Sequence, residues 1–268
     1  MRPSRDWTDI RWTEMAPAEP ARWIAVLPLA ATEQHGPHLP LETDVLIAEA
    51  YLARVRELLP ENNPATFLPV ERIGISTEHI DYPGTLTLPT DVALKRWTAI
   101  GEDVARAGLR KLVIVPSHGG NSAAMMLVAQ DLRAHQKLFV VTTSWSRLSS
   151  AETLFPADEV RHGIHGGAVE TSIMLARYPA EVRSDAIADF PSSSIALEKQ
   201  YRWLSTQRPA PFAWQAQDLH ASGAVGDATL ATPEKGEQLI DQGARAFCEL
   251  LAEVDNFDVN KLRPGPLA

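Results

Sequence analysis

Short apolar runs alternate along the chain with longer segments whose apolar residues recur every three or four positions. The short runs predict strands, and the three-to-four spacing predicts amphipathic helices. The predicted strands cover 22–31, 65–76, 111–117 and 138–145, and the predicted helices cover 44–59, 90–108, 122–136, 168–178 and 233–254. Thr90 suits a helix N-cap, and Pro233 suits a first helical turn.

The predicted strands are apolar at successive positions. The run "KLVIVPS" at 111–117, for example, is continuously apolar and rich in β-branched residues. Strands of this kind that alternate with helices are typical of a parallel sheet covered on both faces. The sequence therefore predicts an α/β fold, a three-layer α/β/α sandwich with a mostly parallel central sheet, built as a single domain from residues 1–268.

Polar loops follow the predicted strands, and titratable residues are concentrated in them. In open α/β sheets, functional groups gather outside the carboxyl ends of the strands. The loops "ATEQHG", "GISTEH", "PSHGGN" and "TTSW" each follow a predicted strand. Four loops that are distant in the chain are thus expected to meet along one rim of the sheet.

Five residues at this rim are candidate metal ligands. Glu33 and His35 are two positions apart, so an extended segment projects both side chains to one side. Asp44 lies near the start of the next helix, His118 lies in the turn "SHGGN", and Glu170 lies in the first turn of 168–178. Carboxylate and imidazole ligands without a thiolate suit Zn²⁺, Mn²⁺ or Fe²⁺. With one carboxylate bridging, this set suffices to hold two divalent ions and activate a water.

The same residues also have structural interpretations. Asp44 fits a helix cap, Glu170 fits a partner of the helix dipole, and His38 fits a hydrogen-bonded loop histidine. The turn "HGGN" equally fits an anion site made by backbone amides at a helix N-terminus. Spacing alone leaves both interpretations open.

The net charge of the chain disfavours polyanionic binding partners. The chain carries 34 acidic and 25 basic residues, a net charge of −9, and the basic residues are scattered. This argues against a nucleic acid or an anionic membrane as the main partner. No apolar run approaches the length of a membrane span, and the first twenty residues lack the apolar core of a signal peptide, so we expect a cytoplasmic protein. The single cysteine, Cys248, lies in an apolar helical segment and is expected to be an inert thiol.

The segment "LPLAATEQHGPHLPLETD" resembles the signature of the creatininase, or creatinine amidohydrolase, family. The resemblance continues in the family's order through "GISTEHIDYPGTLTL", "PSHGGNS", "HGGAVETSIML" and "GAVGDATLATPEKGEQ", and it covers about residues 20–250. It implies the three-layer fold, a homohexamer and two divalent metal ions (Zn, Mn or Fe) per chain. It also implies hydrolysis of a C–N bond in a small cyclic, formyl or peptide-like amide.

The resemblance also implies roles for the candidate ligands. Glu33, His35, Asp44 and His118 match metal ligands of the family, with Asp44 in the bridging position. Creatininase itself has a further acidic ligand two positions after the turn histidine, where this chain has Gly120. Glu170 is then expected to supply the missing ligand and to take part in catalysis. A second metal position that stays unfilled is the alternative.

His165 matches the family's histidine that passes a proton to the departing nitrogen, with the nearby His162 as a rival and loop ordering as the structural alternative. The residues expected to line the substrate pocket are Ser76, Glu78, Trp145, Gly119 and Gly120, with His79 beside them. Trp145 also fits a core position, and Ser76 and Glu78 also fit structural hydrogen bonding. Creatininase closes a tryptophan over its substrate shortly before the proton-transferring histidine. No aromatic residue occupies 156–164 here, which disfavours creatinine as the substrate.

The leading prediction is a metal-dependent amidohydrolase that acts on a non-peptide C–N bond of a small molecule. A two-metal phosphohydrolase, a non-enzymatic small-molecule binder and a peptide-processing accessory enzyme of cofactor maturation are the alternatives. No Arg/Lys cluster near the loops supports the phosphohydrolase. The lack of G-x-G-x-x-G after the first strand argues against a Rossmann dehydrogenase, and the lack of G-x-S-x-G argues against a serine hydrolase.

Overall fold

A four-stranded parallel sheet forms the centre of the computed structural model, which describes residues 3–15, 20–263 and 265–266. Its strands are β1 (Ile24–Leu29), β2 (Ala65–Phe67), β3 (Lys111–Pro116) and β4 (Phe139–Thr142), in the spatial order β2-β1-β3-β4. Ile24 of β1 lies opposite Ala65 of β2 on one side and Lys111 of β3 on the other. Parallel neighbours need crossover connections, which the helices between the strands provide.

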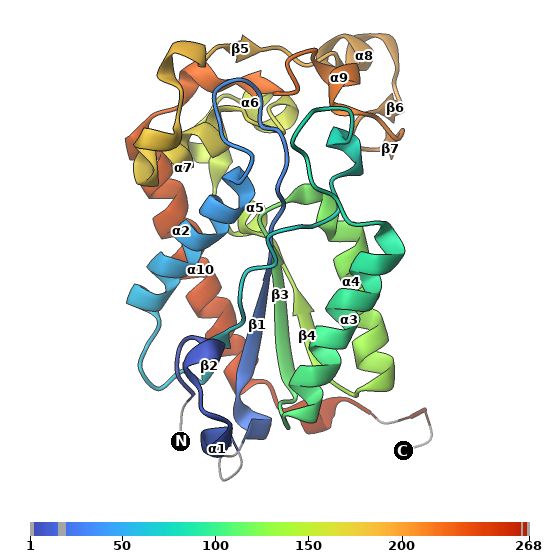
Figure 1. Cartoon of the computed structure of the whole chain (residues 1–268). Coiled ribbons are helices and arrows are strands. Elements are labelled where there is room, and N and C mark those ends of the chain that lie inside the picture. The colour runs from blue at the N-terminus through green and yellow to red at the C-terminus, as the bar shows by residue number, and fades with distance from the viewer. Residues whose placement is uncertain (1–2, 16–19, 264, 267–268) are drawn as a thin grey trace.

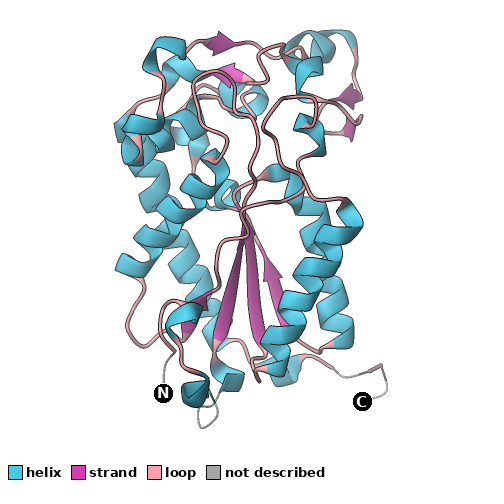
Figure 2. Cartoon of the chain, viewed as in Figure 1, coloured by secondary structure: helices cyan, strands magenta, loops and turns pink. Residues whose placement is uncertain are grey.

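Helices cover both faces of the sheet (Figures 1 and 2). On one face lie α2 (Thr43–Leu58), α7 (Ala168–Arg177) and α10 (Pro233–Asn256), and on the other lie α3 (Thr90–Arg106) and α4 (Ser122–His135). Successive strand residues point to opposite faces. Val26 accordingly packs into the hydrophobic cluster of the α2 side, and its neighbour Leu27 packs into that of the α3 side. The predicted three-layer α/β/α sandwich with a parallel sheet is confirmed.

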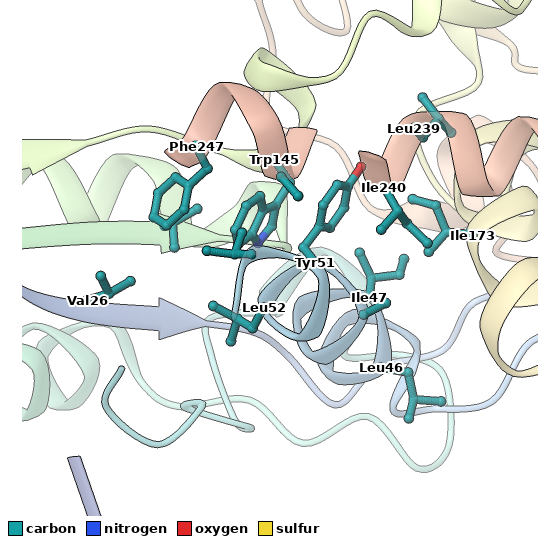
Figure 3. Packing of buried hydrophobic residues seen from close by; sticks show 14 of the residues in the cluster. Val26, Leu46, Ile47, Tyr51, Leu52, Trp145, Ile173, Leu239, Ile240 and Phe247 are labelled. Atoms are coloured by element: carbon teal, nitrogen blue, oxygen red, sulfur yellow. The ribbon is translucent and has the colours of Figure 1, made fainter. Parts of the chain in front are cut away.

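Aromatic stacking fixes the core on the α2 side (Figure 3). The rings of Tyr51 in α2 and Trp145 are parallel, with centroids 4.6 Å apart, and Phe247 of α10 lies 4.9 Å from Trp145. All three residues are at most 2% exposed. Such aromatic pairs are worth about 0.5–1.5 kcal/mol beyond their burial. They hold α2 and α10 in one arrangement beneath the loops at the carboxyl end of the sheet.

Shorter elements complete the structure, most of them beyond the carboxyl ends of the strands, in the upper part of Figure 1. Two small sheets pair β5 (Asp189–Phe190) with β8 (Gly226–Asp227) and β6 (Leu204–Ser205) with β7 (Ala210–Pro211). The other α-helices are α1 (Trp12–Met15), α5 (Trp145–Leu148), α6 (Ala157–His162), α8 (Ser194–Gln200) and α9 (Ala216–Leu219). The 3-10 turns η3 (Thr77–His79) and η4 (Gly119–Asn121) belong to the loops that follow β2 and β3.

Each predicted strand and long helix overlaps an observed one, and the differences lie at the ends. The strand predicted over 65–76 stops at Phe67, and Pro69 soon after it cannot donate a ladder hydrogen bond. The predicted N-cap Thr90 is instead the first residue of α3, and Pro89 occupies the cap position. No helix in the described parts of the chain is long and apolar enough to cross a lipid bilayer.

Candidate metal centre

The five side chains predicted as metal ligands meet beyond the carboxyl end of the sheet. Glu33 and His35 lie in the loop after β1, and Asp44 lies in the first turn of α2. His118 follows β3 and precedes η4, and Glu170 lies in the first turn of α7. Because parallel strands end at one edge of the sheet, residues far apart in the chain come together there.

The carboxylate and imidazole atoms are separated by distances that a metal ion spans. Nδ1 of His118 lies 3.2 Å from Oε1 of Glu33 and 3.5 Å from Oδ2 of Asp44. Nε2 of His35 lies 3.8 Å both from Oδ1 of Asp44 and from Oε2 of Glu170. Two ligand atoms that are each about 2.0–2.2 Å from one zinc ion lie roughly 3–3.5 Å from each other. Asp44 faces His118 with one oxygen and His35 with the other, as a bridging carboxylate does.

Several of these atoms are buried and have no hydrogen-bond partner among the described residues. They are both carboxylate oxygens of Glu33, Nε2 of His35 and Oδ2 of Asp44. The three side chains are at most 1% exposed. A buried polar group without a partner costs roughly 1–3 kcal/mol, and more when it is charged, so native proteins contain few of them. Coordination to a cation satisfies such atoms, and the donor set therefore fits a divalent metal.

Burial and mutual charge shift the pKa values of the cluster in different directions. Burial raises the pKa of Asp44 well above its ordinary value, and the Glu33 carboxylate raises it further. Burial also favours a higher pKa for Glu33, but attraction to His118 outweighs it and the pKa lies below its usual range. Burial alone would lower the pKa of His118, yet the carboxylates of Glu33 and Asp44 hold it well above its usual value. When no metal is bound, protons on Asp44 and His118 reduce the net negative charge of the cluster. A divalent cation would neutralise the same negative charge.

Hydrogen bonds on the outer side of two imidazoles direct lone pairs into the cluster. Nε2 of His118 donates to the carbonyl oxygen of Ile75 at 2.8 Å, so in the neutral ring Nδ1 carries the lone pair. Nδ1 of His35 donates to the carbonyl oxygen of Glu33 at 3.1 Å, which leaves the lone pair on Nε2. Burial lowers the pKa of His35 to about 4, so this ring is neutral near pH 7. Metal-ligating histidines use their second nitrogen in the same way.

Two further histidines lie against the same carboxylate. Nε2 of His79 is 3.4 Å and Nδ1 of His165 is 3.6 Å from Oε1 of Glu33. The two rings stack with centroids 4.1 Å apart, and His165 lies 4.2 Å from the ring of His35. The sequence placed both residues near a substrate, but it gave no sign that they share Glu33 with His118. Only the convergence of three separate loops reveals that contact.

Gly120 and Glu78 occupy the space next to His118. A Cβ at position 120 would lie 2.4 Å from Nε2 of His118, 2.6 Å from Oε1 of Glu78 and 2.6 Å from the carbonyl oxygen of Ile75. No side chain fits there unless these atoms move, so local packing disfavours at this position the acidic ligand that the family resemblance led us to seek. At Gly119, by contrast, no described atom lies within 4 Å of the corresponding Cβ.

The structure corrects the expected place of Trp145. Its ring packs against Tyr51 in the core and is 2% exposed, so it does not line a pocket at the cluster (Figure 3). Ser76 is fully buried, and its hydroxyl has no hydrogen-bond partner in the described parts of the chain. Nδ1 of His162, the rival of His165, bonds instead to the hydroxyl of Ser194 at 2.8 Å.

Glu78 and Glu170 mark the accessible edge of the cluster. Their side chains are 19% and 21% exposed, whereas that of Glu33 is fully buried. A surface hollow of about 540 Å³ elsewhere, beside Cys248, contains no residue of the cluster. Burial raises the pKa of the Cys248 thiol to about 11, which agrees with an inert thiol. The cluster is therefore open to solvent at Glu78 and Glu170.

Comparison with known proteins identifies the family of this chain. The family described as "Creatininase: Creatinine amidohydrolase" matches residues 8–251. A mycofactocin precursor peptide peptidase of Mycobacterium ulcerans (strain Agy99) is 30% identical over 254 residues, covering 92% of this chain and 89% of that protein. The creatinine amidohydrolase of Pseudomonas putida is 27% identical over 246 residues, covering 86% and 89%.

The solved structures agree with the sequence matches. A structure described as "Creatininase Mn" has a TM-score of 0.77 and 25% sequence identity, and the match covers 95% of this chain and 100% of that chain. The family match includes every residue of the cluster and begins upstream of the range 20–250 expected from the motifs. The chain therefore belongs to the creatininase family.

Proposed function

We propose that the protein is a metal-dependent amidohydrolase that cleaves the C–N bond of a small amide with a metal-activated water. The observation that carries the proposal is the buried set of carboxylate and imidazole atoms that face one another at 3.2–3.8 Å, several of which have no hydrogen-bond partner among the described residues. Membership of the creatininase family supports hydrolysis. The manganese named for a solved creatininase supports a divalent ion.

Two ion positions share Asp44 in this proposal. Glu33, Asp44 and His118 would hold one ion, and His35, Asp44 and Glu170 would hold the other. When bound, the ions polarise the amide carbonyl and lower the pKa of a bound water. Glu170 replaces the acidic ligand for which Gly120 leaves no room. Its Oε2 is held in place by a hydrogen bond of 2.6 Å from the N–H of Gly166.

His165 is proposed to carry a proton from the water to the departing nitrogen. Its Nε2 donates to the carbonyl oxygen of Gln34 at 2.6 Å, so Nδ1 presents a lone pair to the cluster. Burial, together with the nearby His35, lowers the pKa of His165 to about 4, and the ring is therefore neutral near pH 7. Nδ1 takes the proton as the water oxygen bonds to the carbonyl carbon, and it delivers that proton to nitrogen as the C–N bond breaks. The backbone amides of Gly119 and Gly120 are the proposed donors to the developing oxyanion.

A short peptide is the second candidate substrate. The relatives named as mycofactocin precursor peptide peptidases favour it, since one is 30% identical along 92% of this chain. Glu78, at the accessible edge, is the proposed contact for a substrate N–H group, because its carboxylate is partly exposed beside His118. Ser76 lies deeper in the same loop. A cyclic or formyl amide remains the first candidate because it needs less room at this nearly closed cluster.

The test of the proposed function couples metal content to turnover. Metal-depleted protein is reloaded with Zn²⁺, Mn²⁺ or Fe²⁺ and assayed on cyclic amides, formamides, short peptides and phosphate esters. We expect about two bound ions per chain and C–N hydrolysis, both strongly reduced in the nearly isosteric Asp44→Asn. Glu42→Gln is the matched control, because Glu42 pairs with Arg72 at 2.6 Å outside the cluster. Full activity of Asp44→Asn would refute the proposal, and turnover of phosphate esters alone would favour a phosphohydrolase.

We also propose that the protein assembles as a homohexamer in the cytoplasm, as the family resemblance implies. Met126 and Leu127 of α4 are 59% and 61% exposed, and they offer apolar surface for contacts between copies. Light scattering on the metal-loaded protein measures the assembled mass, and a monomeric mass would contradict the hexamer.

A further inference from the structure

Among the four imidazoles of the cluster, His79 differs from the others in where its proton lies. The outer nitrogens of His35, His118 and His165 each donate to a backbone carbonyl oxygen, so in the neutral rings the inner nitrogens carry the lone pairs. The outer nitrogen of His79 meets a different group, because its Nδ1 lies 2.7 Å from Nε2 of the Gln34 amide. Which of these two nitrogens carries hydrogen decides what His79 presents to Glu33.

Two backbone groups fix the orientation of the Gln34 amide. Oε1 accepts a hydrogen bond from the N–H of Gly36 at 2.9 Å, and Nε2 donates to the carbonyl oxygen of Gly223 at 3.0 Å. A reversed amide would set oxygen against the Gly223 carbonyl and NH₂ against the Gly36 N–H. A Cβ at Gly223 would lie 2.2 Å from Oε1, and its φ of +84° further disfavours any other residue. The amide is therefore locked with its nitrogen towards His79.

The locked amide makes Nδ1 of His79 an acceptor. A primary amide nitrogen has two hydrogens, and here one goes to Gly223 and the other to His79. The neutral His79 ring must then carry its hydrogen on Nε2, which lies 3.4 Å from Oε1 of Glu33. Nε2 of His165 is also 3.2 Å from the amide nitrogen, but its own hydrogen goes to the carbonyl oxygen of Gln34 at 2.6 Å.

We propose that Gln34 is a positioning residue that fixes His79 as an N–H donor to Glu33, so that His79 is not a metal ligand. Glu33, His79 and His165 have ligand atoms close enough to hold an ion, but the hydrogen on Nε2 leaves His79 no lone pair for one. The N–H faces Oε1 of Glu33, which also lies 3.2 Å from Nδ1 of His118. A carboxylate oxygen has two lone pairs, so one hydrogen bond to Oε1 still leaves lone pairs of Glu33 for coordination. The inference rests on the proposed function in that Glu33 binds metal. Partners of this kind orient metal-binding carboxylates in other proteins.

The position of the proton is measurable without metal. Long-range ¹H–¹⁵N correlation spectra of metal-free protein with ¹⁵N-labelled histidine distinguish the two neutral tautomers, and His79→Gln identifies the signals of His79. We expect hydrogen on Nε2 of His79 in the parent protein. In Gln34→Glu, where an oxygen replaces the donating nitrogen, we expect hydrogen on Nδ1. An Nδ1–H tautomer in the parent, or an unchanged tautomer in Gln34→Glu, would overturn the proposal.

Metal titration tests the consequence for the centre. We expect His79→Gln to bind as many ions per chain as the parent at saturation, with affinity weakened about 10- to 100-fold. The matched variant His35→Gln is expected to lose one ion per chain. Loss of one ion in His79→Gln would overturn the assignment. If the parent binds no metal, the proposed function fails, whereas the tautomer measurement still decides the role of Gln34.

Discussion

A single methyl group added at Gly120 is expected to disturb the metal centre although it replaces no ligand. In Gly120→Ala the new Cβ would lie 2.4 Å from Nε2 of His118 and 2.6 Å from both Oε1 of Glu78 and the carbonyl oxygen of Ile75. Carbon atoms do not approach oxygen or nitrogen so closely without a bond. The Ile75 carbonyl is backbone and holds the His118 ring by a hydrogen bond of 2.8 Å, so neither moves freely.

The size of the effect follows from this overlap. Overpacking a tight site by one methyl group costs about 1–3 kcal/mol. At about 2–4 °C per kcal/mol for a chain approaching this size, Tm should fall by about 2–12 °C. A shift of His118 by about 1 Å also misplaces Nδ1 relative to Glu33 and Asp44, and misplacement on that scale costs about 100-fold in rate. Metal affinity should fall together with turnover, because the displaced atom is a proposed ligand.

Gly119→Ala is the matched control for this experiment. No described atom lies within 4 Å of a Cβ at Gly119, and its backbone is not in the left-handed region. Both variants keep the two backbone amides proposed to bind the oxyanion. Thermal unfolding, metal titration and initial rates are measured on both proteins. Gly120→Ala should show a lower Tm, weaker metal binding and slower turnover, whereas Gly119→Ala should be nearly unchanged. Equal behaviour of the two variants would refute the packing argument.

Three other results are expected. Burial holds the pKa values of His35 and His165 near about 4, below the ordinary 6.5. Their contribution to stability is therefore complete above pH 6.5 and is lost as the pH falls towards 4. The lowered pKa values of His38 and His79 reinforce this loss, and the raised pKa values of His118, Asp44, Glu78 and Glu170 oppose it. Calorimetry on metal-free protein should show Tm falling over that range, and a rising Tm would contradict the burial of neutral rings. Metal at 100 times its Kd should stabilise the protein by about 2.7 kcal/mol per site, and an unchanged Tm would count against a metal centre. Trp145→Phe should lower Tm without changing KM. A raised KM at unchanged Tm would instead indicate that the Trp145 ring contacts the substrate.

The sequence predicted the elements whose own pattern is long enough to specify them. α10 and β3 lie close to their predicted ranges, because a long amphipathic helix and a continuous β-branched run each have one favourable environment in this fold. β2 was overestimated, because its apolar residues continue past Phe67 while Pro69 ends the ladder. The two-residue strands β5 to β8 have no periodicity of their own, and they exist only through contacts between loops.

Residues of the candidate site were likewise predictable only where local sequence limits their position. Glu33, His35 and Asp44 were recognisable because they surround the exit of a buried strand and the start of a helix, where chain direction alone limits their position. Gln34 stands between two predicted ligands and was overlooked, because its role depends on Gly223 in a distant loop. The family resemblance places Trp145 in the pocket, but its ring turns into the core against Tyr51. The direction of a side chain in a loop depends on packing against distant residues, which the local sequence pattern does not reveal.

The burial of Glu33 distinguishes a binding centre from a structural one. An apolar residue of similar volume would remove a buried carboxylate from the interior, and such replacements of buried charge are often neutral or stabilising. Keeping a carboxylate there, beside Asp44, is therefore unfavourable for folding without a cation. A bound divalent ion would reverse the balance, because it would neutralise the carboxylates of Glu33 and Asp44 and displace the protons on Asp44 and His118. Stability gained on metal binding and metal affinity are thus two measurements of the same free energy, and both should fall together when either carboxylate is neutralised.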